Sequence, residues 1–155
     1  MKLVLLVGDH PRHRYIAKQV AENGFLNGVV IEERETHVPE PPGHLDNHLT
    51  ELYSKHFELR ADAEEEFFGD PDLPEVPNIT VTRDELNSKK VREFLQNQEP
   101  DIAISYGVHI LSDETISSIP GKAWNIHGGL SPEYRGAITH FWPSYMLEPQ
   151  MTGVT

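Results

Sequence analysis

The apolar segment of residues 3–7 (LVLLV) constrains the fold of this chain more than any other stretch. It contains no polar residue, and Gly8 follows it at once. A strand with one solvated face alternates apolar and polar residues, whereas a parallel strand covered on both faces is apolar throughout. The segment therefore predicts the central strand of a sheet with helices on both sides.

A helix is predicted directly after this strand. Pro11 suits the first turn of a helix, and Asn23-Gly24 is a typical stop signal. Between them, apolar residues recur at helical spacing (Ile16, Ala17, Val20 and Ala21). A strand followed by a helix is the opening of a parallel α/β sheet.

The same alternation continues along the chain. We expect further strands at residues 28–31, 78–81, 102–105 and 123–127. Residues 82–85 have capping-box spacing ahead of a helix that ends at Pro100, and Ser112 is expected to cap a short helix that ends at Pro120-Gly121. A chain of 155 residues, 37% of them apolar, suffices for one domain. We therefore predict one α/β domain over residues 1–155, with a Rossmann-like open, mostly parallel sheet and helices on both faces.

An acidic insertion is expected between the second and third strands, at about residues 35–77. Turn-rich segments flank it at residues 39–43 and 70–74. Inside it, five apolar residues share helical spacing (Leu45, Leu49, Leu52, Tyr53 and Phe57). We expect an amphipathic helix whose apolar stripe covers one side of the sheet or the substrate cleft. An exposed stripe would instead favour association between copies, so a homo-oligomer stays open.

Composition excludes several classes of function. The net charge is −12, and residues 32–75 hold fourteen acidic and three basic side chains. Nucleic-acid binding needs a basic stripe, and none is visible, so nucleic acid is not an expected partner. There is no apolar run long enough to span a membrane, so we expect no membrane association and a cytoplasmic protein. The absence of Cys excludes disulfides, thiolate metal sites and cysteine nucleophiles.

Residues 125–136 (NIHGGLSPEYRG) carry the strongest candidate site. They leave the end of a predicted strand, where open α/β sheets bind their ligands. Asn125 and His127 are two residues apart, so both side chains should lie on one face of the strand. An amide donor and a titratable ring together suit an acyl transfer to an amine, which needs oxyanion stabilisation and proton handling. The alternative is that Asn125 caps a turn and His127 is a satisfied buried residue.

Two histidine- or arginine-containing clusters are further candidates. Arg12, His13 and Arg14 stand at the start of the first helix, where backbone N–H groups and the helix dipole favour an anion. A charged surface without function is the alternative, because no Gly-x-Gly-x-x-Gly motif accompanies them. His44 and His48 are four apart, but a third ligand is missing, so we expect surface histidines and no metal.

The segment 125–136 resembles the signature of the tetrahydrofolate-dependent formyltransferases, Asn-Ile-His-x-x-Leu-Leu-Pro-x-Tyr-Arg-Gly. Ser131 replaces the second Leu, and the other eight defined positions match. The similarity extends backward through residues 105–111 and forward to Ala137 and Trp142.

This resemblance implies a function and a set of site residues. Asn125 and His127 would be the catalytic pair that transfers a formyl group from 10-formyltetrahydrofolate to a primary amine of a small substrate, preferably a nucleotide-linked amino sugar. A substrate phosphate would bind at Arg12, His13 and Arg14. The folate pocket would be lined by Val108, His109, Ile110 and Leu111.

The resemblance also leaves alternatives. In the family an Asp some tens of residues beyond the Asn orients the His, and this sequence reaches Thr155 before such a position. Residues 151–155 look like the start of a further strand, so we expect a chain truncated before the last strands of its sheet. A methionyl-tRNA or glycinamide-ribonucleotide type of formyltransferase is one alternative. A catalytically incomplete module that binds folate or a nucleotide is the other.

Overall fold

A five-stranded parallel sheet forms the body of the molecule. The computed structural model describes residues 1–35, 38–136 and 139–155, and the strand order is β3-β2-β1-β4-β5. The strands are β1 (Leu3–Gly8), β2 (Leu26–Glu32), β3 (Asn78–Val81), β4 (Ile102–Tyr106) and β5 (Lys122–Ile126). All four pairings between neighbours are parallel. The predicted Rossmann-like α/β fold is confirmed.

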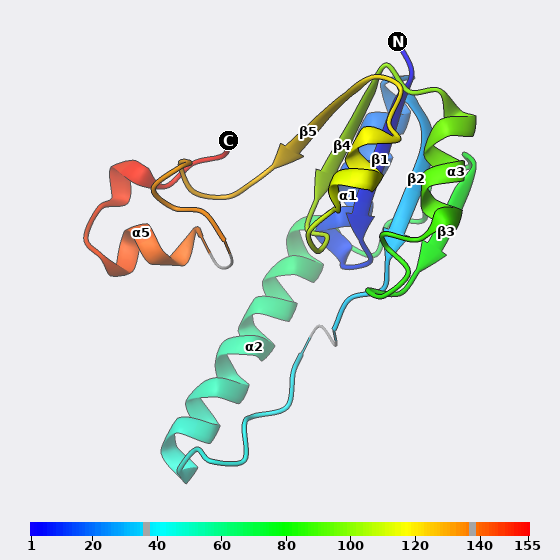
Figure 1. The fold of residues 1–155 in the computed structure, drawn as a ribbon. Helices are drawn as coiled ribbons and strands as arrows, with labels where there is room; N and C mark the ends of the chain where they lie inside the picture. The colour runs from blue at the N-terminus through cyan, green and yellow to red at the C-terminus, as the bar shows by residue number, and fades with distance from the viewer. Residues whose placement is uncertain (36–37, 137–138) are drawn as a thin grey trace.

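Helices cover both faces of this sheet (Figure 1). The described helices are α1 (Pro11–Glu22), α2 (Asn47–Phe68), α3 (Lys89–Gln98), α4 (Asp113–Ser117) and α5 (Phe141–Tyr145), and a short 3₁₀ helix spans Pro149–Met151. On one face, Leu5 and Val7 of β1 pack in a cluster with Ala17 of α1. On the other, Val4 and Leu6 pack in a cluster with residues of α3. Because β1 is buried along its whole length, its uninterrupted apolar sequence is explained.

The start of α3 differs from the prediction. The capping-box contact exists, since Glu85 Oε2 accepts from the Thr82 amide at 3.0 Å, but it closes a turn. The helix begins at Lys89 after Ser88. Between the two, Leu86 is fully buried. The turn lets Leu86 enter the core before the helix starts, which explains the shift.

The inserted helix is present, but its apolar stripe does not pack on the sheet. Asp46 caps α2 by accepting from the Leu49 amide at 2.8 Å, so Leu45 and His44 precede the helix. No described residue of α2 is buried, and Leu49 and Leu52 are 47% and 50% exposed. Figure 1 shows why: the carboxyl-terminal end of α2 meets the domain, and its amino-terminal end projects away from the sheet. The stripe therefore does not cover the sheet, whereas Phe57, one of its residues, lines the cavity at the carboxyl ends of the strands, as the alternative prediction of a cleft cover expected.

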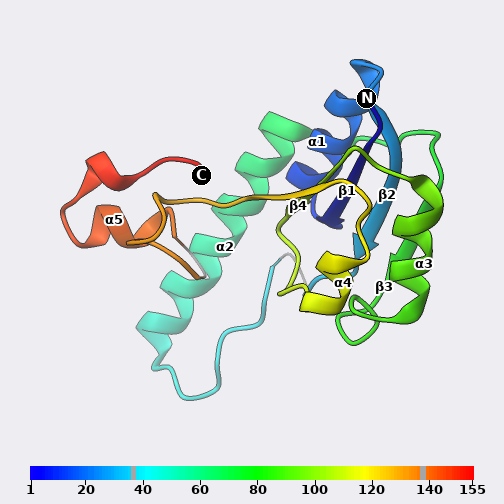
Figure 2. The same cartoon turned by 45° about the horizontal axis from the view of Figure 1, so that its top comes forward.

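The segment after β5 folds back on itself beside the sheet (Figure 2). His127 and Thr155 exchange backbone hydrogen bonds of 2.8 and 2.9 Å, and Gly128 forms an antiparallel bridge with Val154. Residues 151–155 thus pair with the extension of β5 and add no strand to the sheet. Ala137 lies outside the described residues. Within the described ranges, no helix combines the length and apolar character needed to cross a membrane.

Candidate functional site

A cavity of about 1360 Å³ lies where β4 and β5 end, and loops after β1 and β2 also reach it. From β1 the chain first adds β2 and β3 on one side of the sheet and then adds β4 and β5 on the other side. The direction of strand addition thus reverses at β1. Open α/β sheets bind ligands at the carboxyl edge near such a reversal. The cavity exceeds the usual 300–1,000 Å³ of small-molecule sites, which leaves room for two reactants.

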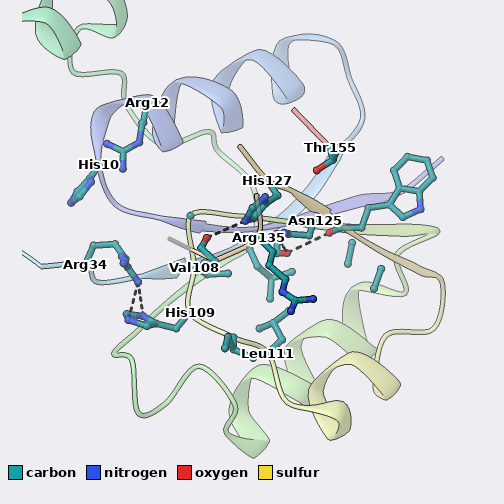
Figure 3. Close-up of a pocket in the computed structure, with 18 of the residues that line it drawn as sticks. His10, Arg12, Arg34, Val108, His109, Leu111, Asn125, His127, Arg135 and Thr155 are labelled. Atoms are coloured by element: carbon teal, nitrogen blue, oxygen red, sulfur yellow. Dashed lines mark hydrogen bonds between the residues drawn. The ribbon is translucent and has the colours of Figure 1, made fainter. Parts of the chain in front are cut away.

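Asn125 and His127 both line this cavity, as their spacing predicted (Figure 3). The Asn125 Oδ1 atom accepts from the Ser105 hydroxyl at 2.9 Å. Its side chain is exposed toward the cavity, and none of the described residues accepts from its Nδ2 group. The amide therefore offers two N–H donors to a ligand.

His127 is held with one ring nitrogen directed at a carbonyl. Nε2 lies 3.0 Å from the Gly136 oxygen, and because a carbonyl can only accept, Nε2 carries the proton. The other nitrogen, Nδ1, is buried and has no hydrogen-bond partner within the described part of the chain. A buried nitrogen of this kind is unusual in a folded protein and indicates a place for an additional partner.

The loop after β4 forms another wall of the cavity. Val108, His109, Ile110 and Leu111 all line it, so the predicted folate residues and the predicted catalytic pair share one space. Ile110 is 91% exposed, and such an apolar side chain at a cavity mouth can pack against a flat ligand.

A buried ionic cluster holds this loop in place. Glu32, at the end of β2, is fully buried; its Oε2 accepts from the His109 amide at 2.8 Å and its Oε1 lies 2.5 Å from His109 Nδ1. The Arg34 guanidinium contacts the His109 ring and donates to Glu35 at 3.0 Å. The side chain of His109 is thus engaged in tying the loop after β4 to the end of β2.

The structure separates the three residues predicted to bind an anion. Arg12 lines the cavity, but its Nη1 donates to both carboxylate oxygens of Glu64 at 2.7 and 3.0 Å. Arg14 does not line the cavity; it donates to the Asp9 carbonyl at 3.1 Å and lies 3.7 Å from the Asp70 carboxylate.

His13 is 1% exposed and is outside the cavity lining. Its ring lies against Gly8 and Gly107, at the carboxyl ends of β1 and β4. Burial, which penalises the charged ring, is the largest of the causes that lower its pKa from 6.5 to about 3, and the nearby Arg12, His10 and Arg34 contribute in the same direction. His13 is therefore neutral near pH 7.

Several cavity residues were missed by sequence reasoning. They are Ser105, Arg34 and Arg60; Phe57 also lines the cavity, and it belongs to the stripe that was expected to cover the sheet or the substrate cleft. Glu32, which holds the loop after β4 but does not line the cavity, was missed as well. It had a signal, because an acidic residue ends the apolar run of residues 28–31 at the carboxyl edge of a buried strand. Across the described ranges, no three His, Asp or Glu side chains are grouped as metal ligands, and His44 and His48 are exposed.

No protein-family model matches the chain.

Proposed function

We propose that this cavity transfers a formyl group from 10-formyltetrahydrofolate to a primary amine, with Asn125 and His127 as the catalytic pair. One observation carries the proposal: an amide with two available N–H donors and an imidazole share one cavity at the carboxyl edge of the sheet. Both belong to residues 125–136, the segment that resembles the formyltransferase signature.

The residues suit the chemistry of this transfer. The amine nitrogen attacks the formyl carbon, and a tetrahedral oxyanion forms. Asn125 Nδ2 and His127 Nε2 donate to that oxygen, His127 turning from the Gly136 carbonyl to do so. The C–N bond to the folate then breaks. The attacking nitrogen loses a proton to water, and the folate nitrogen gains one.

The folate would rest against the loop after β4. Its pterin ring is flat and partly apolar, which fits the apolar side chains of Val108, Ile110 and Leu111. The ionic cluster of Glu32, Arg34 and His109 would keep this wall rigid without needing the ligand.

The unpartnered Nδ1 of His127 is consistent with the Asp that the resemblance implies. A carboxylate that accepts from Nδ1 would orient the ring and stabilise its protonated form. The unpartnered Nδ1 is also consistent with the alternative of a catalytically incomplete module, because none of the described residues places a carboxylate at this atom.

The proposed acceptor is a small amine, preferably a nucleotide-linked amino sugar. Four arginines line the cavity of a chain whose net charge is −12 (Arg12, Arg34, Arg60 and Arg135). Arginine suits phosphate because its planar fork can donate two hydrogen bonds. A tRNA acceptor is less favoured, because the acidic surface would repel it. A glycinamide-ribonucleotide acceptor remains the other small-molecule alternative.

A transfer assay tests the proposal. The protein is incubated with 10-formyltetrahydrofolate and a panel of amines: nucleotide-linked amino sugars, glycinamide ribonucleotide and charged initiator tRNA. Mass spectrometry should find one amino sugar heavier by one CO, in a reaction that needs the folate. Formylation of the tRNA would instead support a methionyl-tRNA type of formyltransferase. Folate binding without any formylated product would support the incomplete module and contradict the proposed function.

A further inference from the structure

We infer that Ser105 is a positioning residue of this cavity: its hydroxyl determines which end of the Asn125 amide faces the reacting group. This inference rests on the proposed function for its catalytic meaning. Its structural content, the orientation of one amide, is independent of that function.

The contact is set by the pairing of β4 with its neighbour β5, the edge strand. Ser105 of β4 and Asn125 of β5 are partners in the parallel register, so their side chains leave the sheet side by side. The Ser105 Oγ atom lies 2.9 Å from Asn125 Oδ1 and 3.4 Å from the Trp124 carbonyl. Ser105 is 9% exposed, whereas Asn125 is open to the cavity. The hydroxyl therefore holds Asn125 from the buried side.

The orientation of a side-chain amide is decided by its hydrogen bonds. Its oxygen and nitrogen ends have nearly the same shape but opposite hydrogen-bonding roles. Within the described ranges, Ser105 is the donor that contacts Asn125 Oδ1. With Oδ1 directed at Ser105, Nδ2 faces the cavity and presents donors to a developing oxyanion. In the opposite orientation Oδ1 would face that oxyanion and repel it.

A set of variants at position 105 distinguishes the effect of the hydroxyl group from the effect of side-chain volume. Ser105→Ala removes the donor. Ser105→Thr and Ser105→Val add similar bulk, but Thr alone keeps a hydroxyl. Ser117→Ala, on the exposed surface of α4, is the matched control.

The kinetic readout is the turnover of the intact protein with 10-formyltetrahydrofolate and the active amine of the panel. We expect kcat to fall about tenfold in Ser105→Ala and Ser105→Val, the scale of one lost hydrogen bond. KM for the folate should stay within about twofold. Ser105→Thr should retain most of the activity, and Ser117→Ala all of it. Equal loss in the Thr and Val variants would show that only packing matters, and would overturn the inference.

A spectroscopic readout needs no acceptor. In protein labelled with ¹⁵N in asparagine side chains, the Nδ2 proton pair of Asn125 is assigned by its loss in Asn125→Asp. We expect two well-separated proton signals in the wild type and in Ser105→Thr. In the Ala and Val variants they should move toward the shifts of a free asparagine side chain or broaden, because rotation about the Cβ–Cγ bond then averages the surroundings of the amide. Unchanged signals in those variants would overturn the inference.

The two readouts fail separately. If the signals change as expected but no amine is formylated by the wild type, Ser105 orients Asn125 and the proposed function is wrong. If transfer occurs and kcat is unchanged in Ser105→Ala, the proposed function stands and the positioning role is wrong.

Discussion

His13 occupies the space that side chains on two glycines would fill. A Cβ at Gly107 would lie 2.3 Å from the His13 Nε2 atom, and one at Gly8 would lie 2.5 Å from Nδ1. The ring also packs edge-on against Tyr106, with 4.9 Å between ring centroids. Its place in the sequence, between two arginines, suggested a charged surface group. Sequence reasoning failed here because the glycines that bury the ring come from two other parts of the chain.

The buried His13 should make stability depend on pH. The pKa of His13 is about 3 in the folded protein and 6.5 in the unfolded chain. Between these two pH values, His13 is protonated in the unfolded chain and neutral in the folded protein. The free energy of unfolding should therefore fall as the pH falls through this window, by up to about 1.4 kcal/mol per pH unit from this residue. His13→Phe should flatten the slope in urea titrations between pH 6 and pH 4. His48→Phe, on the exposed surface of α2, is the control. An equal slope in wild type and His13→Phe would contradict the account.

Substituting Gly107 tests the same packing from the other side. Gly107→Ala places a methyl group against His13 at a φ of +69°, whereas Gly24→Ala has a similar φ of +74° and no atom within 4 Å. We expect Gly24→Ala to cost about 1–2 kcal/mol of unfolding free energy. Gly107→Ala should cost about 1–3 kcal/mol more because of overpacking. Equal losses in chemical denaturation would mean that the close contact is unimportant.

At the scale of elements, local sequence patterns predicted the strands and most helix ends. Ser112 caps α4 as expected, and Asn23 and Gly24 end α1. The errors concern contacts made far along the chain. Leu86 enters the core before α3 begins, and the apolar stripe of α2 finds no partner on the sheet. A periodic pattern shows which face of a helix is apolar but not what covers it.

Helix α2 should act on ligand binding more than on stability. It packs on α1 through the ring contact between Phe68 and Tyr15, at 5.4 Å, and Phe57 lines the cavity. We expect Phe57→Ala to raise KM for the amine about three- to tenfold and to leave KM for the folate nearly unchanged. Leu52→Ala, equally on α2 but half exposed and outside the cavity lining, should change neither. A Phe57→Ala variant that weakens both ligands together would assign α2 a bracing role instead.

At the scale of the whole molecule, the fold was predictable because one apolar strand required helices on both faces. The region of the site was predictable for a related reason, since parallel strands end at one edge. The cluster of Glu32, Arg34 and His109 was not, because its partners are 75 and 77 residues apart and no local pattern joins them. Ser105 was missed likewise, since strand register alone brings it to Asn125.

The net charge of −12 gives a prediction for the whole molecule. At about 0.15 M salt, the protein should not bind initiator tRNA, because the chain carries 25 acidic and only 13 basic side chains and so repels the phosphate backbone. Fluorescence titration with labelled tRNA measures this, with a basic tRNA-binding protein as positive control. Tight binding that weakens steeply with salt would contradict the prediction and favour a tRNA acceptor.

A single-turnover assay shows whether Asn125 and His127 carry out the proposed formyl transfer in this cavity. Excess protein is mixed with 10-formyltetrahydrofolate labelled in the formyl group and with the amine panel, and label on the amine is followed over time. Asn125→Ala and His127→Ala should each slow transfer by roughly 10²–10³, as expected for loss of an oxyanion donor. Asn97→Ala and His48→Ala, at exposed positions, should match the wild type. Transfer at the wild-type rate in both cavity variants would contradict the account.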